Sequence, residues 1–308
     1  FSLSDAHQQT RELSPDILWN MKFTWKESLP VAKKATLASV KTYSEALFEK
    51  TFLEAMVYGD LEKNDANVIV DLFKQKTKTE GLTRDRVFDL KYLSMENPEE
   101  IQYSAKLRVN NSCFFREYMV GNDSPNMRAK SRVIAAALQQ PFYTEMRTNQ
   151  QLGYIVWSYS SAKDETYFLS FLIQSGVYPA DELDKRAGTF LLSSPNILKE
   201  MDEDMFQQLI KSEIEKLERL PKSIAERARM LKTLIFEHDA DYSRDNKTIE
   251  ALKNLNKNEV VELMEVIFSP ESRKMINVLT FAENHEDASG IKNSFDNLKD
   301  WKSLRVYK

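Results

Sequence analysis

The three histidines of this 308-residue chain are the first residues to test for catalytic chemistry. Zinc peptidases hold their metal with two histidines one helical turn apart and use a neighbouring glutamate as the base. His7, His238 and His285 lie far apart in the sequence, and the segment that begins His285-Glu286 has Ser289 where a second histidine is required. We therefore predict no metal site in this chain, and surface or helix-capping positions for its histidines.

Other catalytic and cofactor-binding patterns are also missing from the sequence. It contains no GxSxG nucleophile elbow and neither of the glycine-rich loops that bind phosphate. Its single cysteine, Cys113, excludes an internal disulfide and lies in an apolar, aromatic stretch, which predicts a buried structural thiol. From residue spacing alone, the chain carries no self-sufficient catalytic apparatus.

The segment from Glu145 to Val156 offers a different chemistry, because it places hydrogen-bond donors where a predicted helix ends and a predicted strand begins. Arg147 has a planar fork of five donors, and Tyr154 has a phenolic donor on a short stem. Donors that converge on one point suit a peptide carbonyl or its developing oxyanion. An arginine at a helix C-terminus and a half-buried strand tyrosine explain the two residues equally well. Gly153 would permit a bulge or a close backbone approach.

Composition and charge exclude several classes of protein. The 43 basic and 47 acidic residues are interspersed and give a net charge of −4, so no basic surface for nucleic acid is indicated. No apolar run approaches the roughly 20 residues that span a bilayer. We therefore expect neither nucleic-acid nor membrane partners. The chain starts at Phe1 without an initiator methionine or a signal-peptide pattern, and we expect this start to be a cut end.

Hydrophobic periodicity predicts strands in the middle of the chain and helices on either side of them. Strands are expected at 51–59, 87–93, 101–109, 113–120, 152–161, 165–175 and 274–280. Helices are expected at 14–24, 31–50, 62–73, 180–193, 202–219, 222–237 and 257–267. A further helix is expected to start at Asp123-Ser-Pro125, where proline suits the first turn.

A polar stretch at 74–81 reads as a linker and places a domain boundary near residue 84. Beyond it, strands in a run followed by helices in a run predict an α+β fold. In that fold an antiparallel sheet has helices packed on one face.

The string from Met146 to Trp157, followed by Phe171-Leu-Ile-Gln-Ser175, resembles the fourth domain of the pitrilysin and insulin-degrading-enzyme family. In that family R-T-x-x-Q-L-G-Y opens a strand, and its hairpin partner ends in I-Q-S or L-Q-S. The flanks Leu53–Asp60 and Asp241–Asn246 resemble weaker family segments. The resemblance implies that 84–308 is the fourth family domain, a C-terminal chamber wall. It also implies that 1–83 is the closing part of the third domain plus a linker.

The resemblance also implies a divided active site. Family members are zinc metalloendopeptidases whose metal and catalytic base belong to the first domain, so zinc is expected in the full-length enzyme and not in this chain. Arg147 and Tyr154 match the family's substrate-binding residues, and Tyr154 is expected to stabilise the oxyanion. Tyr143 falls at an aromatic position that lines the substrate pocket, with Tyr in place of Phe. The expected partners are a peptide substrate and the N-terminal half of the same polypeptide. This fragment alone is expected to be inactive.

Two matters stay open at this point. The alternative to a peptidase part is a non-catalytic structural or binding homologue of the same fold, although such a protein has no need of both Arg147 and Tyr154. The compartment follows only from the resemblance: periplasmic for a bacterial source and cytosolic for a eukaryotic one.

Overall fold

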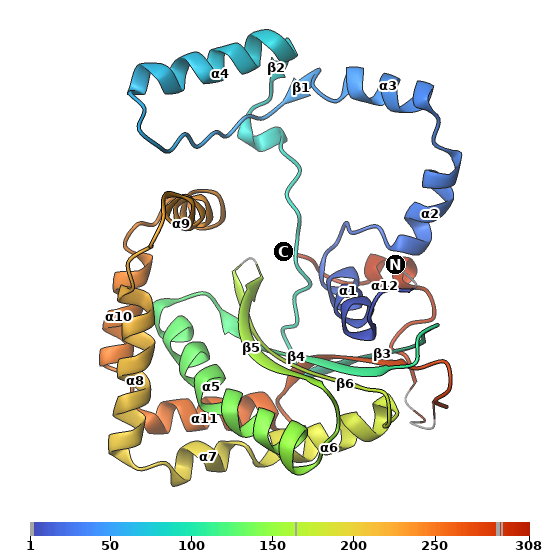
Figure 1. The fold of residues 1–308 in the computed structure, drawn as a ribbon, viewed down its shortest axis with the longest axis vertical. Coiled ribbons are helices and arrows are strands. Elements are labelled where there is room, and N and C mark those ends of the chain that lie inside the picture. The colour runs from blue at the N-terminus through green and yellow to red at the C-terminus, as the bar shows by residue number, and fades with distance from the viewer. Residues whose placement is uncertain (1–2, 164, 288–289, 291) are drawn as a thin grey trace. The chain divides into compact units, whose positions relative to one another are not determined.

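The computed structural model describes residues 3–163, 165–287, 290 and 292–308, and its chain divides into two compact units (Figure 1). Unit 1 comprises Phe1–Asn20, Tyr92–Arg219 and Tyr242–Lys308, and unit 2 comprises Met21–Lys91 and Leu220–Asp241. This division differs from a single boundary near residue 84, because 1–20 joins the C-terminal part and 220–241 joins the N-terminal part. Which family domain each part corresponds to remains a prediction.

Unit 1 is built on a five-stranded sheet with the order β3-β7-β4-β6-β5. The strands are β3 (Glu99–Lys106), β4 (Ser112–Asn122), β5 (Ile155–Lys163), β6 (Thr166–Ser175) and β7 (Lys274–Phe281). All neighbours are antiparallel except β3 and β7, which run parallel. The predicted α+β class and the mainly antiparallel sheet are confirmed.

One face of the sheet is covered by helices α5 (Pro125–Tyr143), α6 (Ala180–Ser193) and α11 (Lys257–Phe268). Helices α8 (Glu203–Glu218) and α10 (Arg244–Lys253) pack on α5 as an outer layer, and α7 (Pro195–Glu200) packs on α11 (Figure 1). Helix α5 begins as predicted: Ser124 caps it by accepting a hydrogen bond from the Met127 amide at 3.1 Å, and Pro125 follows. Between these helices and the sheet lies the larger of two hydrophobic cores, in which Phe171 packs against Phe142.

The opposite face of the sheet is covered by α1 (Ala6–Leu18), which sequence periodicity placed too late, at 14–24. Pro15 lies inside α1 without ending it. The helix buries Ile17 and Leu18 in a second core that includes Phe115 of β4. Central strand β4 therefore packs on both faces, and its residues 112–118 are all buried, including the charged Arg116 and Glu117. The expectation of helices on one face describes most helices but leaves out α1.

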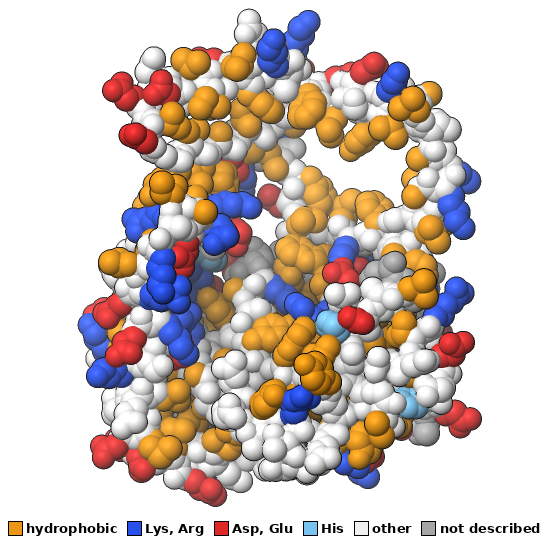
Figure 2. All heavy atoms as spheres, in the orientation of Figure 1, with side chains coloured by type: hydrophobic (Ala, Val, Ile, Leu, Met, Phe, Trp, Pro, Cys, Tyr) orange, Lys and Arg blue, Asp and Glu red, His pale blue; other side chains and the backbone are white. Residues whose placement is uncertain are grey.

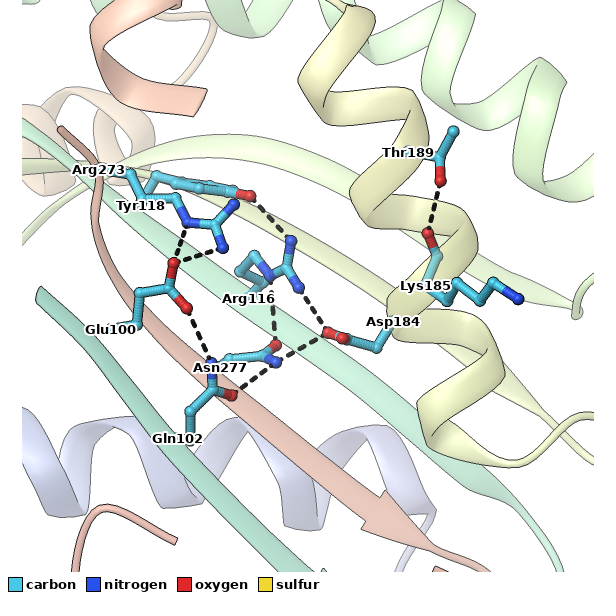
Figure 3. A network of polar contacts seen from close by, with 9 residues as sticks. All are labelled: Glu100, Gln102, Arg116, Tyr118, Asp184, Lys185, Thr189, Arg273 and Asn277. Atoms are coloured by element: carbon cyan, nitrogen blue, oxygen red, sulfur yellow. Dashed lines mark hydrogen bonds and ion pairs between the residues drawn. The ribbon is translucent and has the colours of Figure 1, made fainter. Parts of the chain in front are cut away.

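A buried polar network joins α6 to the centre of the sheet (Figure 3). Arg116 of β4 donates to Asp184 of α6 at 2.6 Å and to the hydroxyl of Tyr118 at 2.9 Å. Asn277 of β7 donates to the same Asp184 oxygen at 2.8 Å and to Gln102 of β3 at 2.9 Å. Arg116 is only 4% exposed, and its guanidinium is bonded to side chains of β4, α6 and β7, while Asn277 extends the network to β3.

Unit 2 contains four longer helices: α2 (Trp25–Lys34), α3 (Leu37–Ala46), α4 (Lys63–Thr77) and α9 (Ile224–Glu237). None of these helices has a buried residue, and apolar side chains of α3 and α4 stand exposed on the surface (Figure 2). The short strands β1 (Lys50–Thr51) and β2 (Glu80–Gly81) pair in parallel, and a 3-10 turn, η1, spans Arg84–Arg86.

Three sequence predictions near unit 2 are wrong in detail. The long helix expected at 31–50 is interrupted because Thr36 and Ser39 form a capping box that starts α3. The strand expected at 51–59 is reduced to the two residues of β1. The segment 87–93 forms no strand, although Tyr92 and Leu93 make single bridges to Trp19 and Tyr307. The segment 51–59 has no buried residue, and apolar alternation without burial does not suffice to form a strand.

Candidate functional site

The three residues predicted to contact substrate come together where α5 ends and β5 begins. Tyr143 is the last residue of α5, and Arg147 lies in the following turn of π-helix, η2 (Thr144–Asn149). Tyr154 immediately precedes β5. The turn is closed by the Gln150 amide, which donates to the Glu145 carbonyl at 3.0 Å, and it is anchored by the fully buried Met146. Wide turns of this kind occur often at functional sites, because they redirect side chains out of the helical register.

The Arg147 side chain folds across the strand entrance. Its Nη1 donates to the carbonyl oxygens of Gly153 at 3.0 Å and Tyr154 at 2.8 Å. Its guanidinium carbon lies 4.5 Å from the centre of the Tyr154 ring and 6.0 Å from that of Tyr143, within cation–π range of both. Within the described parts of the chain, Nε and Nη2 of Arg147 have no hydrogen-bond partner, so donors remain for a ligand.

The two tyrosines differ in exposure. Tyr154 is 83% exposed and Tyr143 is 40% exposed, whereas most aromatic side chains of unit 1 are buried or half-buried. Because the Arg147 guanidinium lies over the Tyr154 ring, that ring is held in place while its surface stays accessible. An exposed but positioned phenol is a suitable hydrogen-bond donor for a ligand.

Gly153 provides the close backbone approach that the sequence indicated. A Cβ atom at this position would lie 1.9 Å from the carbonyl oxygen of Gln174, so no side chain fits. The preceding Gln151 adopts a left-handed conformation with φ of 52°. The glycine therefore lets the chain enter β5 directly beside the end of β6, which sets the position of Tyr154. This prediction is confirmed.

Glu145 also belongs to the site, although no role was predicted for it from the sequence. Its carboxylate accepts hydrogen bonds from the side-chain amides of Asn149 at 2.7 Å and Gln150 at 2.8 Å. These hydrogen bonds, from Asn149 and then Gln150, lower the pKa of Glu145 below its usual value. The carboxylate therefore stays ionised and stabilises η2 rather than acting as a proton donor. Amide side chains four and five residues after a glutamate are the signal that could have indicated this.

The histidines do not form a metal site. His7 is buried, with its Nδ1 2.9 Å from the Gln174 side chain and its ring edge-on to Trp157 at 5.2 Å, so its predicted surface position is wrong. His285 pairs with Ser112 at 2.8 Å, and His238 lies at the C-terminal end of α9. In the part of the chain that the structure describes, no three His, Cys, Asp or Glu side chains gather as metal ligands would. The residues present therefore do not fit a zinc ion.

Cys113 is inert. It is fully buried, and its burial raises the pKa of the thiol to about 12, although a hydrogen bond from Thr10 acts in the opposite direction. The predicted structural thiol is confirmed.

Comparisons with known proteins identify the relatives of this fold. Residues 133–232 match the family model "PQQ synthase PqqF-like, C-terminal lobe domain 4", which includes the whole of the Arg147–Tyr154 segment. Insulin-degrading enzyme of Mus musculus is 25% identical over 284 residues, which are 88% of this chain and 27% of that protein. Protease 3 of Escherichia coli is 20% identical over 264 residues, which are 85% of this chain and 27% of that protein. The chain is thus similar in sequence to these peptidases over most of its length.

The solved structures agree on the fold. Pitrilysin superposes on the whole chain with a TM-score of 0.83 at 17% identity, and this chain covers 33% of it. The peptidase M16 inactive domain from Pseudomonas fluorescens superposes on 82% of the chain with a TM-score of 0.55 at 15% identity. The chain thus spans about a quarter to a third of the length of insulin-degrading enzyme, protease 3 and pitrilysin. Among its described helices, none has the length and apolar character needed to cross a membrane.

Gly153→Ala is expected to destabilise the chain by about 1–3 kcal/mol, the usual cost of forcing extra atoms into a packed site. The alanine methyl must displace the Gln174 carbonyl and with it the start of β5. Gly81→Ala is the matched control, because a Cβ there meets no atom within 4 Å. Chemical denaturation of both variants measures the difference, and equal stabilities would contradict the close approach.

Proposed function

We propose that this chain is the substrate-clamping, C-terminal part of a zinc-dependent endopeptidase that cleaves peptides or small polypeptides. In this proposal the zinc and the catalytic base belong to an N-terminal half of the same polypeptide. The arrangement of Arg147, bonded to the backbone at the entrance of β5 and stacked beside Tyr154, carries the proposal. It presents fixed donors and an exposed phenol.

Each side chain has a separate role in the proposed clamp. The unpaired donors of Arg147 bind a carbonyl oxygen of the peptide backbone, and the Tyr154 hydroxyl donates to the oxygen that becomes negative as the scissile carbonyl is attacked. The half-exposed Tyr143 ring lines the adjoining side-chain pocket. Relatives named insulin-degrading enzyme and A-factor-processing enzyme support a peptide as the substrate class.

The rival proposal is a non-catalytic homologue that binds or supports a partner. It is favoured by the similarity of fold to a domain described as an inactive M16 peptidase domain. The exposed Tyr154 beside the fixed Arg147 favours the clamp instead. The compartment, periplasmic or cytosolic, remains an expectation from the resemblance; one plant relative is named as peroxisomal.

The division of the active site predicts that the purified 308-residue chain neither retains stoichiometric zinc nor hydrolyses peptides. The reason is that His7 and His285 are bonded to Gln174 and Ser112 in unit 1, whereas His238 lies at the end of α9 in unit 2. Metal analysis, together with cleavage of a fluorogenic peptide with and without chelator, checks this. Stoichiometric zinc with chelator-sensitive cleavage would show that the chain itself is the enzyme.

Arg147→Ala in the longer enzyme is expected to raise KM and lower kcat together, for a combined loss on the order of 10²-fold in kcat/KM. The substitution removes the peptide-binding donors and also releases the carbonyls of Gly153 and Tyr154. Arg108→Ala is the control, since Arg108 is an exposed arginine in the turn after β3. Steady-state kinetics on one peptide decide the matter; unchanged constants for Arg147→Ala would place this residue outside the site.

A further inference from the structure

The two edges of the five-stranded sheet are treated differently, and the first edge, β3, is covered. The Ser294 amide donates to the Gln102 carbonyl at 2.8 Å, and the Ser294 hydroxyl accepts from the Gln102 amide at 2.9 Å. Two residues further along β3, the Ser104 amide donates to the Asn293 side chain at 2.6 Å. Asn293 and Ser294 thus pair with outward-facing backbone groups of β3, and this prevents another strand from pairing with that edge.

The other edge, β5, has no such cover. Among the described residues of unit 1, no hydrogen bond from outside the sheet reaches the backbone of Ile155–Ala162. This stretch, Ile-Val-Trp-Ser-Tyr-Ser-Ser-Ala, contains no charged residue, proline or glycine, which are the usual protections of an edge strand. The first charge, Lys163, turns inward to the buried Glu117. In an antiparallel pair every second residue directs its N–H and C=O away from the partner, so β5 offers a row of free groups.

Side chains of β5 also carry polar groups without a hydrogen-bond partner in the described structure. The hydroxyls of Ser158, Ser160 and Ser161 are shielded from solvent and have no hydrogen-bond partner in the described structure. Trp157 and Tyr159 both lie under the guanidinium of Arg11, at 5.6 and 5.9 Å from their ring centres, which holds their rings in place. The edge is therefore an ordered strand with unused polar groups.

We propose that β5 is a docking strand for an extended peptide, which adds to the sheet as a sixth strand through backbone hydrogen bonds. This inference rests on the proposed function, because the docking strand begins directly after Tyr154, next to the donors of Arg147. A peptide held by the clamp continues directly along Ile155–Ala162, a length of about 26 Å at roughly 3.3 Å per residue. The free backbone groups of β5 therefore extend the clamp, and the ligand that we expect them to bind is a peptide.

Pairing through the backbone predicts a particular selectivity. The affinity is expected to depend on the peptide's backbone N–H groups, because hydrogen bonds between strands do not involve side chains. Peptides of many different sequences are therefore expected to bind. Only every second peptide amide faces β5, so methylation of one alternating set of amides abolishes binding and methylation of the other set leaves it nearly unchanged. A peptide read through its side chains alone has no such alternation.

The test uses the full 308-residue chain and a ten-residue peptide of alternating valine and threonine with a lysine at each end. We expect saturating peptide to slow amide hydrogen exchange at alternate residues of Ile155–Ala162, with no slowing in β3. The two complementary N-methylated peptides are expected to differ at least tenfold in affinity. Equal affinities, or binding without protection of β5, would overturn the docking strand.

The outcomes also separate this inference from the proposed clamp. If Arg147→Ala weakens peptide binding but the bound peptide does not slow amide exchange in β5, the clamp is retained and the docking strand is rejected. Protection of β5 that Arg147→Ala does not affect would retain the docking strand and reject the clamp role of Arg147. Protection that appears without peptide and rises with protein concentration would show a second copy on β5, which contradicts a peptide occupant. No binding at millimolar peptide would reject both.

Discussion

Tyr154→Phe in the longer enzyme is expected to lower kcat on the order of 10²-fold, the usual effect of removing one oxyanion donor. The substitution deletes only the hydroxyl, so the ring beside Arg147 and the entrance of β5 stay as they are. Because the proposed bond forms mainly as charge develops on the scissile oxygen, KM is expected to change little.

Tyr143→Phe is the matched control for this prediction. It removes the same atom from the neighbouring ring, which lies 6.0 Å from the Arg147 guanidinium and is proposed to act only as an apolar wall. Its kcat is expected to stay within a factor of about three of the wild type. Steady-state kinetics on both variants check the pair. Similar values for the two would move the oxyanion role away from Tyr154.

Asp184→Ala is expected to destabilise unit 1 by about 3–5 kcal/mol, the cost of leaving a buried charge without its partner. Asp184 accepts from both Arg116 and Asn277, and the Arg116 side chain is only 5% exposed to solvent (Figure 3). Loss of this carboxylate leaves the guanidinium with only Tyr118 and Asn277 as partners.

Glu262→Ala on the exposed side of α11 is the control for the network, with an expected change within about 0.5 kcal/mol. Guanidinium denaturation followed by the near-ultraviolet signal of the unit 1 aromatics measures both. A loss below about 1 kcal/mol for Asp184→Ala would mean that the network contributes little to holding α6 on the sheet.

Strong periodicity predicted most of unit 1. The helix 180–193 matches α6 at both ends, and the strands expected at 165–175 and 274–280 match β6 and β7 to within one residue. Local signals sufficed there: the capping Ser124 with Pro125 starts α5 as it would in an isolated helix. The close backbone approach at Gly153 was also predictable, because a glycine at the entrance of a strand often marks a bulge or a close backbone contact.

The features that the sequence did not predict depend on contacts between distant residues. His7 is buried because Gln174, 167 positions away, accepts from both its amide and its ring. Arg116 and Asp184 pair across 68 positions, and nothing in the local sequence of either residue indicates a buried ion pair. The hydrogen bonds from Arg147 to its own backbone also needed the geometry of η2. Such pairs follow from the packed fold and not from periodicity.

The most direct test of the clamp is the structure of the longer enzyme, inactivated by removal of its metal, with an uncleaved peptide bound. We expect the Tyr154 hydroxyl to lie within about 2.7–3.1 Å of the scissile carbonyl oxygen, the range of an oxyanion donor. We also expect Arg147 to donate to a peptide carbonyl nearby. A bound peptide whose scissile carbonyl lies out of hydrogen-bond reach of both side chains would contradict the proposal that this chain clamps the substrate.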